Sequence, residues 1–255
     1  MFGERESRGM VRTRLDRALV DRGLAAKRWR ARDLIGRGCV LVNGAPQTKA
    51  GLEIRETDEV SVVSGANSFV SRGGVKLSAA LAQFGFDASG RVALDIGAST
   101  GGFTQVLLEA GARRVYAVDV GRGQLHPSLR QDSRVVSLEG TDARVLSRAE
   151  VSEPVGALVA DVSFISLTKV LPVPLSFAAR GAWLIALIKP QFEAGRAAVG
   201  KSGVVRDPAD RQRAVDLVSS WLSQQPGWTV EGVIDSPLLG GSGNQEYLIG
   251  ARKHE

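Results

Sequence analysis

The chain has 255 residues, enough for one large domain and a smaller one, and 44% of them are hydrophobic. Its single cysteine excludes an internal disulfide framework and fits a reducing cytoplasm. The longest apolar run, residues 181–188, is too short to cross a bilayer, and the charged first residues do not resemble a secretory signal. We therefore expect a cytoplasmic protein with no membrane partner; the oligomeric state stays open.

The net charge of +6 is concentrated near the N-terminus. Between Arg8 and Arg37, ten Lys or Arg residues stand against three Asp, a balance of +7, so the rest of the chain carries about −1. One dominant sign predicts a nucleic-acid-binding surface, because a merely solvated helix face normally mixes both signs. The first nine residues show no periodicity and are left out of the expected fold.

Residues 10–63 predict a small α+β domain. Residues 13–16 have the pattern of a capping box that opens a helix, and the helix stops at a glycine. A second helix is expected over about residues 27–35, with basic side chains on its outer face. Two short strands follow, over residues 40–44, which end in an Asn-Gly turn, and over residues 60–63.

Arginines of this module supply the candidate contacts to RNA. Such contacts go mainly to phosphates, so they provide affinity and salt dependence but little sequence information. Trp29 suits either stacking on a base or packing against the second domain, and packing is the favoured alternative. The candidate RNA-binding residues are Arg12, Arg14, Arg28, Arg30 and Arg32.

Residues 64–67 form a short polar linker, and residues 68–255 alternate strands with helices. The last two strands are separated only by residues 236–244, which is too short for a crossover helix, so these strands must be antiparallel neighbours. The pattern predicts an α/β domain with a seven-stranded, mostly parallel sheet. The expected strands lie near residues 92–96, 114–119, 134–138, 156–160, 182–188, 229–235 and 245–250, with helices near 74–84 and 208–222.

Residues 92–104 carry the most specific signal for a ligand. An apolar strand runs into a glycine-rich turn and then a helix, and about twenty residues later a second strand ends in Asp119. This order is typical of a nucleoside-binding half of a Rossmann-type sheet. A dinucleotide fingerprint has three glycines, which would fall at Gly97, Ser99 and Gly102, so its middle glycine is missing here.

The missing glycine and a carboxylate beside the turn disfavour a ligand with phosphates. They favour one with an ammonium and a ribose and predict S-adenosylmethionine; the alternative is a turn whose glycines serve packing only. Asp95 and Gly97 are expected at the methionine end and Asp119 at the ribose, whereas Asp142 either meets the adenine amino group or caps a turn. The candidate cofactor-binding residues are Asp95, Gly97, Ala98, Ser99, Thr100, Gly101, Asp119 and Asp142.

Charged residues gather where strands of the second domain end. Asp161 and Lys189 each close an apolar strand, Glu246 opens the last strand, and Lys76 lies on the first helix. A lysine at the end of a buried strand is costly unless it is paired or functional. The structural alternative for Lys189 is a snorkelling or salt-bridged side chain. In the expected topology these strand ends surround the cofactor.

The sequence resembles two known families at these residues. The N-terminal module, with V-L-V-N-G at residues 40–44, looks like the S4 RNA-binding domain. The motifs SRGGVKL, LDIGASTGGFT, VDVGRGQL, DVSFISL, KPQFE and GNQEY resemble the TlyA family, a branch of the FtsJ-like 2'-O-ribose methyltransferases with an S4 domain in front. This resemblance covers the chain from Met10 onward.

The TlyA resemblance implies a class I, Rossmann-like methyltransferase domain after a small α+β S4 domain. It implies a catalytic tetrad of Lys76, Asp161, Lys189 and Glu246. The implied reaction is S-adenosylmethionine-dependent 2'-O-methylation of cytidine in 16S ribosomal RNA, 23S ribosomal RNA or both, with ribosomal subunits as partners.

Methyl transfer from a sulfonium needs alignment and an activated hydroxyl. We expect a neutral Lys189, deprotonated with help from desolvation and a second lysine nearby, to take the proton while Lys76 holds the hydroxyl or a phosphate; the two can exchange roles. No metal is required, since two histidines and one cysteine supply no ligand cluster. Two alternatives stay open: an FtsJ-like enzyme for another structured RNA or a small molecule, and a non-catalytic ribosome assembly factor.

Overall fold

The computed structural model describes residues 12–36, 38–63 and 69–254 of the chain. These residues form two compact units, one within residues 1–67 and the other within residues 68–255. Each unit buries its own apolar side chains, so each has its own hydrophobic core.

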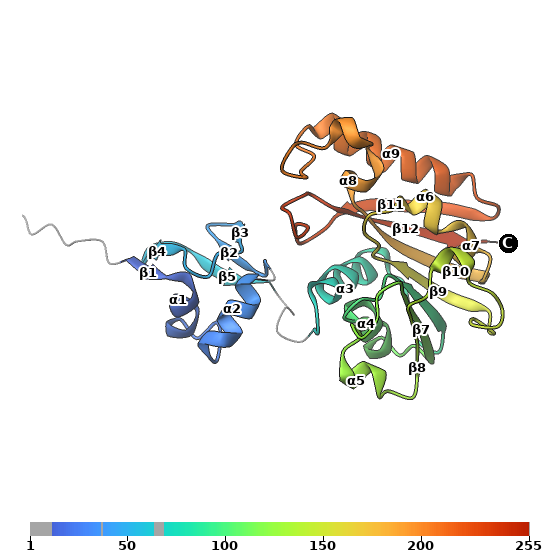
Figure 1. Ribbon diagram of the computed structural model, residues 1–255, viewed down its shortest axis with the longest axis horizontal. Coiled ribbons are helices and arrows are strands. Elements are labelled where there is room, and N and C mark those ends of the chain that lie inside the picture. The colour runs from blue at the N-terminus through green and yellow to red at the C-terminus, as the bar shows by residue number, and fades with distance from the viewer. Residues whose placement is uncertain (1–11, 37, 64–68, 255) are drawn as a thin grey trace, which may run out of the picture. The chain divides into compact units, whose positions relative to one another are not determined.

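The N-terminal unit combines two helices with two small antiparallel sheets (Figure 1). One sheet pairs β1 with β4, and the other has the order β3-β2-β5. The predicted second helix is confirmed, and the face opposite its basic side chains is fully buried through Ala31, Leu34 and Ile35. The elements are β1 (Arg12–Arg14), α1 (Leu15–Asp21), α2 (Arg28–Gly36), β2 (Val40–Val42), β3 (Ala45–Gln47), β4 (Glu53–Arg55) and β5 (Val60–Val62).

The start of the first helix differs from the prediction. The predicted capping box is wrong because Thr13 lies in β1, where it pairs with Ile54 of β4. Helix α1 begins at Leu15, with Arg14 at the N-cap position and no side-chain capping hydrogen bond. Asp16, which the pattern placed in the cap, instead turns into the unit and is fully buried.

The C-terminal unit alternates strands and helices, and each predicted strand is present within a few residues of its expected bounds. The strands are β6 (Val92–Ile96), β7 (Arg114–Asp119), β8 (Val135–Glu139), β9 (Val155–Ala160), β10 (Ala178–Ile188), β11 (Trp228–Asp235) and β12 (Tyr247–Lys253). The helices are α3 (Arg72–Phe84), α4 (Gly102–Glu109), α5 (Pro127–Arg130), α6 (Leu167–Val170), α7 (Pro172–Leu175), α8 (Pro190–Glu193) and α9 (Pro208–Ser223), with 3-10 turns η1 (Ala143–Val145) and η2 (Arg196–Ala198).

The sheet has the order β11-β12-β10-β9-β6-β7-β8 (Figure 1). Strands β6, β7, β8, β9 and β10 are parallel, whereas β12 runs antiparallel to both β10 and β11. The predicted antiparallel pairing of the last two strands is therefore confirmed. The carboxyl ends of β6, β7, β9 and β10 meet along one edge of the sheet, which is where open α/β sheets bind ligands.

Helices cover both faces of this sheet, and successive strand residues alternate between two cores. Leu94 and Ile96 of β6 join the core under α6, α7 and α9. Ala93 joins the opposite core, with Leu77 of α3 and Leu107 of α4. This alternation follows from the two-residue period of a β-strand, and it also decides which way Asp95 points.

Candidate active site

Two adjoining cavities open at the carboxyl edge of the sheet. The first, of about 560 Å³, is lined by all four residues of the predicted tetrad. The second, of about 1310 Å³, is lined by Asp119 and Asp142. Gly97 and Asp161 line both cavities, so the two meet where β6 and β9 end. A ligand in one cavity can therefore face a ligand in the other.

The turn between β6 and α4 has a left-handed backbone at Gly97, Ser99 and Gly101, with φ of +85°, +47° and +97°. A Cβ on Gly97 would lie 2.6 Å from the carbonyl oxygen of Asp161, so only glycine lets the turn approach β9 this closely. Ser99 adopts this conformation although it is not glycine, and its backbone N–H donates to Asp119 Oδ2 at 2.8 Å. That hydrogen bond helps to hold the strained residue in place.

Most of the turn residues predicted to bind the cofactor line the first cavity; these are Gly97, Ala98, Ser99 and Thr100. Gly101 is an exception that corrects the prediction. A Cβ on Gly101 would lie 2.3 Å from Leu129 Cδ1 and 2.8 Å from Leu125 Cδ1. This glycine therefore makes room for packing against α5 and its preceding loop.

The acids predicted at the ribose and adenine both line the second cavity. Asp119 accepts backbone hydrogen bonds from Ser99 at 2.8 Å and Gly121 at 2.7 Å, one on each oxygen. Each oxygen keeps a further lone pair that a ribose hydroxyl can use. Asp142 instead binds the side chain of Arg144, which together with the Arg144 backbone N–H lowers the pKa of Asp142. Asp142 therefore has the turn-capping role, at the start of η1.

Asp95 lines neither cavity of the described structure, which corrects its predicted place at the methionine end. It is fully buried on the α4 side of β6, where its Oδ2 accepts a hydrogen bond from Thr104 Oγ1 at 2.6 Å. Its Oδ1 has no hydrogen-bond partner among the described residues. Burial raises the pKa of Asp95 to about 7, because little of the surroundings stabilises its charge. The hydrogen bond from Thr104 joins β6 to α4, the two elements that the turn connects.

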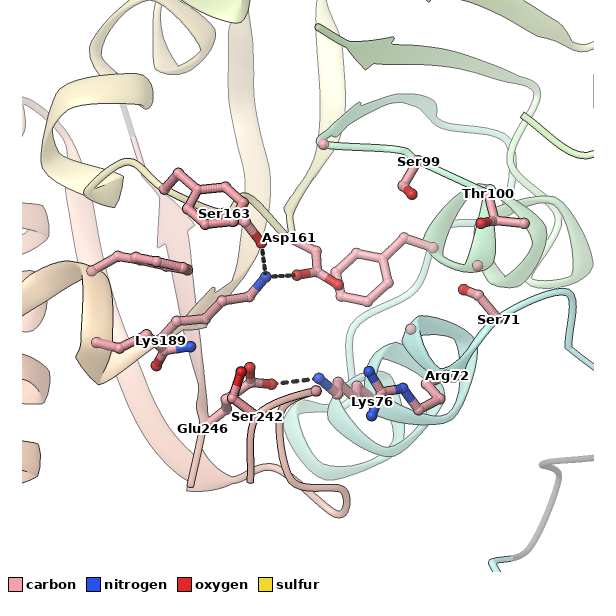
Figure 2. A pocket seen from close by; sticks show the side chains of 18 of the residues that line it. Ser71, Arg72, Lys76, Ser99, Thr100, Asp161, Ser163, Lys189, Ser242 and Glu246 are labelled. Atoms are coloured by element: carbon pink, nitrogen blue, oxygen red, sulfur yellow. Dashed lines mark hydrogen bonds and ion pairs between the residues drawn. The ribbon is translucent and has the colours of Figure 1, made fainter. Parts of the chain in front are cut away.

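The tetrad forms two separate lysine–carboxylate pairs that face the first cavity (Figure 2). Lys189 Nζ lies 2.7 Å from Asp161 Oδ1 and donates a hydrogen bond to Ser163 Oγ at 2.9 Å. Lys76 Nζ donates to Glu246 Oε2. The side chains of Lys76 and Glu246 are 6% and 3% exposed, against 11% and 24% for Lys189 and Asp161. A ligand in the cavity therefore has better access to the Lys189 pair.

Both lysines line the same cavity, but each has a carboxylate partner. Each lysine has its own carboxylate, and such a partner stabilises the ammonium form rather than the neutral amine. Each pair is also neutral overall, which offsets part of the cost of burying two charges. Lys189 is thus salt-bridged, as the structural alternative supposed, and faces a cavity as well. Only the neutral amine of Lys189 can act as a base.

Sequence reasoning missed the loop between β9 and α6. Its Ser163 holds Lys189, as described above. Phe164 has a left-handed backbone, with φ of +66°, and a side chain that is 91% exposed beside both cavities. Its ring lies 5.2 Å from that of Phe192 in α8. The motif DVSFISL marked the loop, but nothing in the sequence distinguished this exposed ring from a core phenylalanine.

A partly buried carboxylate, that of Glu193, links this loop to α8. Glu193 accepts hydrogen bonds from Ser166 Oγ at 2.6 Å and from the backbone N–H of Leu167 at 2.8 Å. Desolvation raises the pKa of Glu193, although the two hydrogen bonds act in the opposite direction. Because α8 directly follows Lys189, this link ties the segments carrying Asp161 and Lys189 together.

The arginines predicted to bind RNA lie on the N-terminal unit in different settings. Arg30 forms an ion pair along α2, and Arg12 is exposed on β1. Trp29, which precedes Arg30 in α2, is 67% exposed. The others surround one buried carboxylate, that of Asp16, at distances of 3.0 to 3.2 Å. These are Arg14, Arg28 and Arg32.

Within residues 12–254, apart from the undescribed segments, no helix is long and apolar enough to cross a membrane. The same residues contain no group of three His, Cys, Asp or Glu side chains placed to hold a metal ion.

Comparisons with known proteins agree over most of the chain. Residues 69–253 match the family model of FtsJ-like methyltransferases, and residues 13–60 match that of the S4 domain. The 16S/23S rRNA (cytidine-2'-O)-methyltransferase TlyA of Mycobacterium tuberculosis is 48% identical over 94% of this chain and 90% of its own. Hemolysin A of Brachyspira hyodysenteriae is 41% identical over 92% and 98%.

Solved structures support the same relationship. A hemolysin-like protein from Streptococcus thermophilus superposes with a TM-score of 0.73 at 38% identity, covering 97% of this chain and 90% of its own. An O-methyltransferase from Bacillus cereus in complex with SAH shares the fold of the larger unit, with a TM-score of 0.51 at 17% identity over 72% of this chain and 82% of its own.

The strand order, with one antiparallel strand inserted beside the parallel ones, defines a class I methyltransferase. The two cavities lie at the edge where such a sheet binds its ligands. Together with an S4 domain in front, the matches show that the chain belongs to the TlyA family of FtsJ-like methyltransferases.

Proposed function

We propose that this chain transfers the methyl group of S-adenosylmethionine to the 2'-hydroxyl of a cytidine in ribosomal RNA. One observation carries the proposal: a cavity that can hold a nucleoside adjoins a cavity faced by two lysine–carboxylate pairs. Gly97 and Asp161 lie at the junction. A hydroxyl in the first cavity can therefore be aligned with a methyl donor in the second, and alignment supplies much of the rate of such a transfer.

The residues of the second cavity fit S-adenosylmethionine. Asp119 keeps lone pairs for ribose hydroxyls, and the apolar side chains of Ile96, Val118 and Ile165 suit an adenine ring. When bound, the cofactor supplies an electrophilic methyl group on a sulfonium. Ser99, which lines both cavities, provides a polar group for its methionine part, and Thr100 provides another from the first cavity.

Lys189 is the residue that we assign to the proton of the 2'-hydroxyl. Asp161 lies 2.7 Å from its Nζ and orients it, and Lys189 gives up one proton to solvent before the reaction. The amine so formed takes the hydroxyl proton as the oxygen bonds to the methyl carbon and the carbon–sulfur bond breaks. The more deeply buried Lys76–Glu246 pair is assigned to holding the hydroxyl or an adjacent phosphate.

The same surfaces support an RNA substrate rather than a small molecule. The exposed ring of Phe164 beside the cavities offers a face on which a base can stack. The S4 domain adds a cluster of half-exposed arginines, which suits the phosphate backbone.

Methyl transfer to unmodified ribosomal subunits, measured with radiolabelled S-adenosylmethionine, tests the proposal. We expect Lys189→Ala to lower kcat on the order of 10²- to 10⁴-fold, because the proton acceptor is lost, with little change in cofactor affinity. Lys253→Ala is the matched control, since Lys253 bonds the backbone of Ala178 on β10 and lines neither cavity. Near-normal methylation by Lys189→Ala would remove Lys189 from the chemistry.

Mapping the modified nucleotide separates the competing functions. A methylated cytidine ribose in the RNA of either subunit supports the proposal. Label that enters only other RNAs, or a small molecule, would assign the domain to a different substrate. Tight subunit binding without any label transfer would identify a non-catalytic assembly factor.

A further inference from the structure

Asp16 lies in the first turn of α1 and is completely buried, with 0% of its side chain exposed. Arg14 and Arg28 each donate two hydrogen bonds to it, and Arg32 donates one, over 3.0 to 3.4 Å. The side chains of these arginines are 49%, 54% and 55% exposed. One hidden carboxylate thus holds three partly exposed cations, which we call the Asp16 cluster.

The cluster keeps Asp16 ionised inside the protein. Desolvation alone would raise the pKa of Asp16, but the hydrogen bonds from Arg14, Arg32 and Arg28 outweigh it and hold the pKa well below its ordinary value. The carboxylate therefore stays negative at any pH at which RNA is bound. Its charge cancels only one of the three positive charges, so the exposed side of the cluster carries +2.

The geometry of the cluster is set by side chains from separate elements. Arg14 lies at the end of β1, whereas Arg28 and Arg32 lie one turn apart on α2. The guanidinium of Arg14 also passes over Gly51, where a Cβ would meet its Nη1 at 3.3 Å. A larger residue at position 51 would have to displace this arginine.

Each guanidinium has nitrogen atoms that do not bind Asp16 and are available to another ligand. Arg14 and Arg28 direct Nε and Nη2 at Asp16, and Arg32 directs only Nε. Among the described residues, the remaining Nη groups have no hydrogen-bond partner. Guanidinium groups fixed in this way match the oxygens of a phosphate without first losing rotational freedom.

We infer that Asp16 is a positioning residue for RNA: it arranges Arg14, Arg28 and Arg32 into one preformed site for backbone phosphates. The inference rests on the proposed RNA-directed function and adds to it a buried acid that never touches the RNA. It makes a prediction that net charge alone does not. Removing the negative charge of Asp16 makes the surface more positive, yet RNA binding becomes weaker.

The test compares Asp16→Asn with Asp21→Asn in the full chain, using unmodified ribosomal subunits as the probe. Asp21 lies on the same helix but pairs with Arg17 on the surface, and the two side chains are 56% and 72% exposed. Both substitutions add one positive charge. We expect Asp16→Asn to weaken binding about tenfold and to flatten the dependence of log K on log salt, by roughly one per lost phosphate contact. Asp21→Asn should bind as tightly as the wild type or more tightly.

Steady-state kinetics distinguish positioning from loss of folded protein. Asp16→Asn is expected to raise KM for the subunits while kcat and the Kd for S-adenosylmethionine stay within about twofold. If circular dichroism shows that Asp16→Asn does not fold, Arg28→Lys is tested in its place. Lysine keeps the positive charge but lacks the planar guanidinium that donates two parallel hydrogen bonds. Its control is Arg17→Lys, and only Arg28→Lys is expected to lose affinity.

Equal binding by wild type and a folded Asp16→Asn, or by Arg28→Lys and Arg17→Lys, would overturn the inference. Failure of the wild type itself to bind subunits would instead contradict the proposed function, so the two failures are distinguishable.

Discussion

The carboxyl of Asp95 gives the stability of the larger unit a pH dependence. Its pKa in the folded chain is about 7, above the ordinary 3.8. The protonated acid therefore makes its full contribution to the free energy of unfolding below about pH 4. This contribution is lost as the pH rises through about 7. Relative to Asp95→Asn, which stays neutral, the free energy of unfolding of the wild type should fall by up to about 4 kcal/mol across this range.

Urea unfolding of both proteins between pH 4 and pH 8 measures this difference. The control is Asp87→Asn, which changes an exposed acid in the same unit. Curves for wild type and Asp95→Asn that stay parallel over the whole range would show that Asp95 is ionised in the folded protein.

The Lys76–Glu246 pair makes a second prediction at this scale. Glu246→Gln leaves the ammonium of Lys76 buried without its counter-charge, and breaking such a pair costs about 3–5 kcal/mol. Replacing both residues by methionine removes the uncompensated charge and should restore most of the lost free energy of unfolding. Denaturant titration of the two variants gives both values.

A surface pair serves as the comparison for Glu246→Gln. Glu231→Gln breaks the ion pair with Arg252 on the neighbouring strand, where both side chains are about one-third exposed. We expect this change to cost less than about 1 kcal/mol. A Glu246→Gln effect as small as that of Glu231→Gln would mean that water or relaxation screens the buried lysine.

At the scale of elements, α3 and α4 approach each other through Gly102. A Cβ on this residue would lie 2.1 Å from Ser71 Oγ and 2.8 Å from the backbone nitrogen of Gly74. The serine can rotate, but the backbone of α3 cannot move without shifting Lys76. We expect Gly102→Ala to destabilise the protein by about 1–3 kcal/mol and to lower methyl transfer.

Thermal unfolding and the labelled-methyl assay measure these two effects. In the helical Gly36→Ala control, no atom of the described residues outside the helix's own backbone lies within 4 Å of the new Cβ, so only helix propensity changes, by a gain of at most about 1 kcal/mol. If Gly102→Ala were equally harmless, the two helices would be free to separate.

The sequence predicted the large sheet more reliably than the small ones. Strands β6 to β12 bury long apolar runs or alternate clearly, and the short link before β12 fixed its direction. The strands of the smaller unit have three residues each, too few to show a period, so only the valine-rich β2 and β5 could be predicted and β1, β3 and β4 could not. The same shortness explains the wrong capping box, since pairing of Thr13 with Ile54 overrode the local pattern.

The site could be predicted to the level of strand ends but not of side-chain partners. Charged residues after parallel strands must meet at one edge, which brought Asp161 and Lys189 together, whereas the addition of Lys76 and Glu246 was implied by the resemblance to the TlyA family. Which lysine takes which carboxylate depends on distances that no motif contains. The place of Asp95 differs from the prediction for a related reason: alternation along β6 turns its side chain into the core beneath α4, where it binds Thr104 and is fully buried.

For the molecule as a whole, cofactor and RNA binding should be separable, because their residues lie in different compact units. Asp119→Ala should raise the Kd for S-adenosylmethionine in calorimetry and leave the affinity for ribosomal subunits unchanged. Arg28→Gln combined with Arg32→Gln should do the reverse. In the triple variant the two free-energy effects should add within about 0.5 kcal/mol.

An unchanged cofactor Kd in Asp119→Ala would remove that acid from the site. Strong non-additivity in the triple variant would show instead that RNA bound to the S4 domain changes the cofactor site.

The place of β12 in the sheet has a consequence for synthesis of the chain. This strand lies between β10 and β11, so β11 cannot join the sheet until residues 247–253 have been made. Glu246 precedes the same strand, and until it arrives the ammonium of Lys76 has no counter-charge. Since chains fold from the N-terminus as they emerge, the S4 domain is complete well before the active site. A nascent chain can therefore hold RNA before it can methylate it.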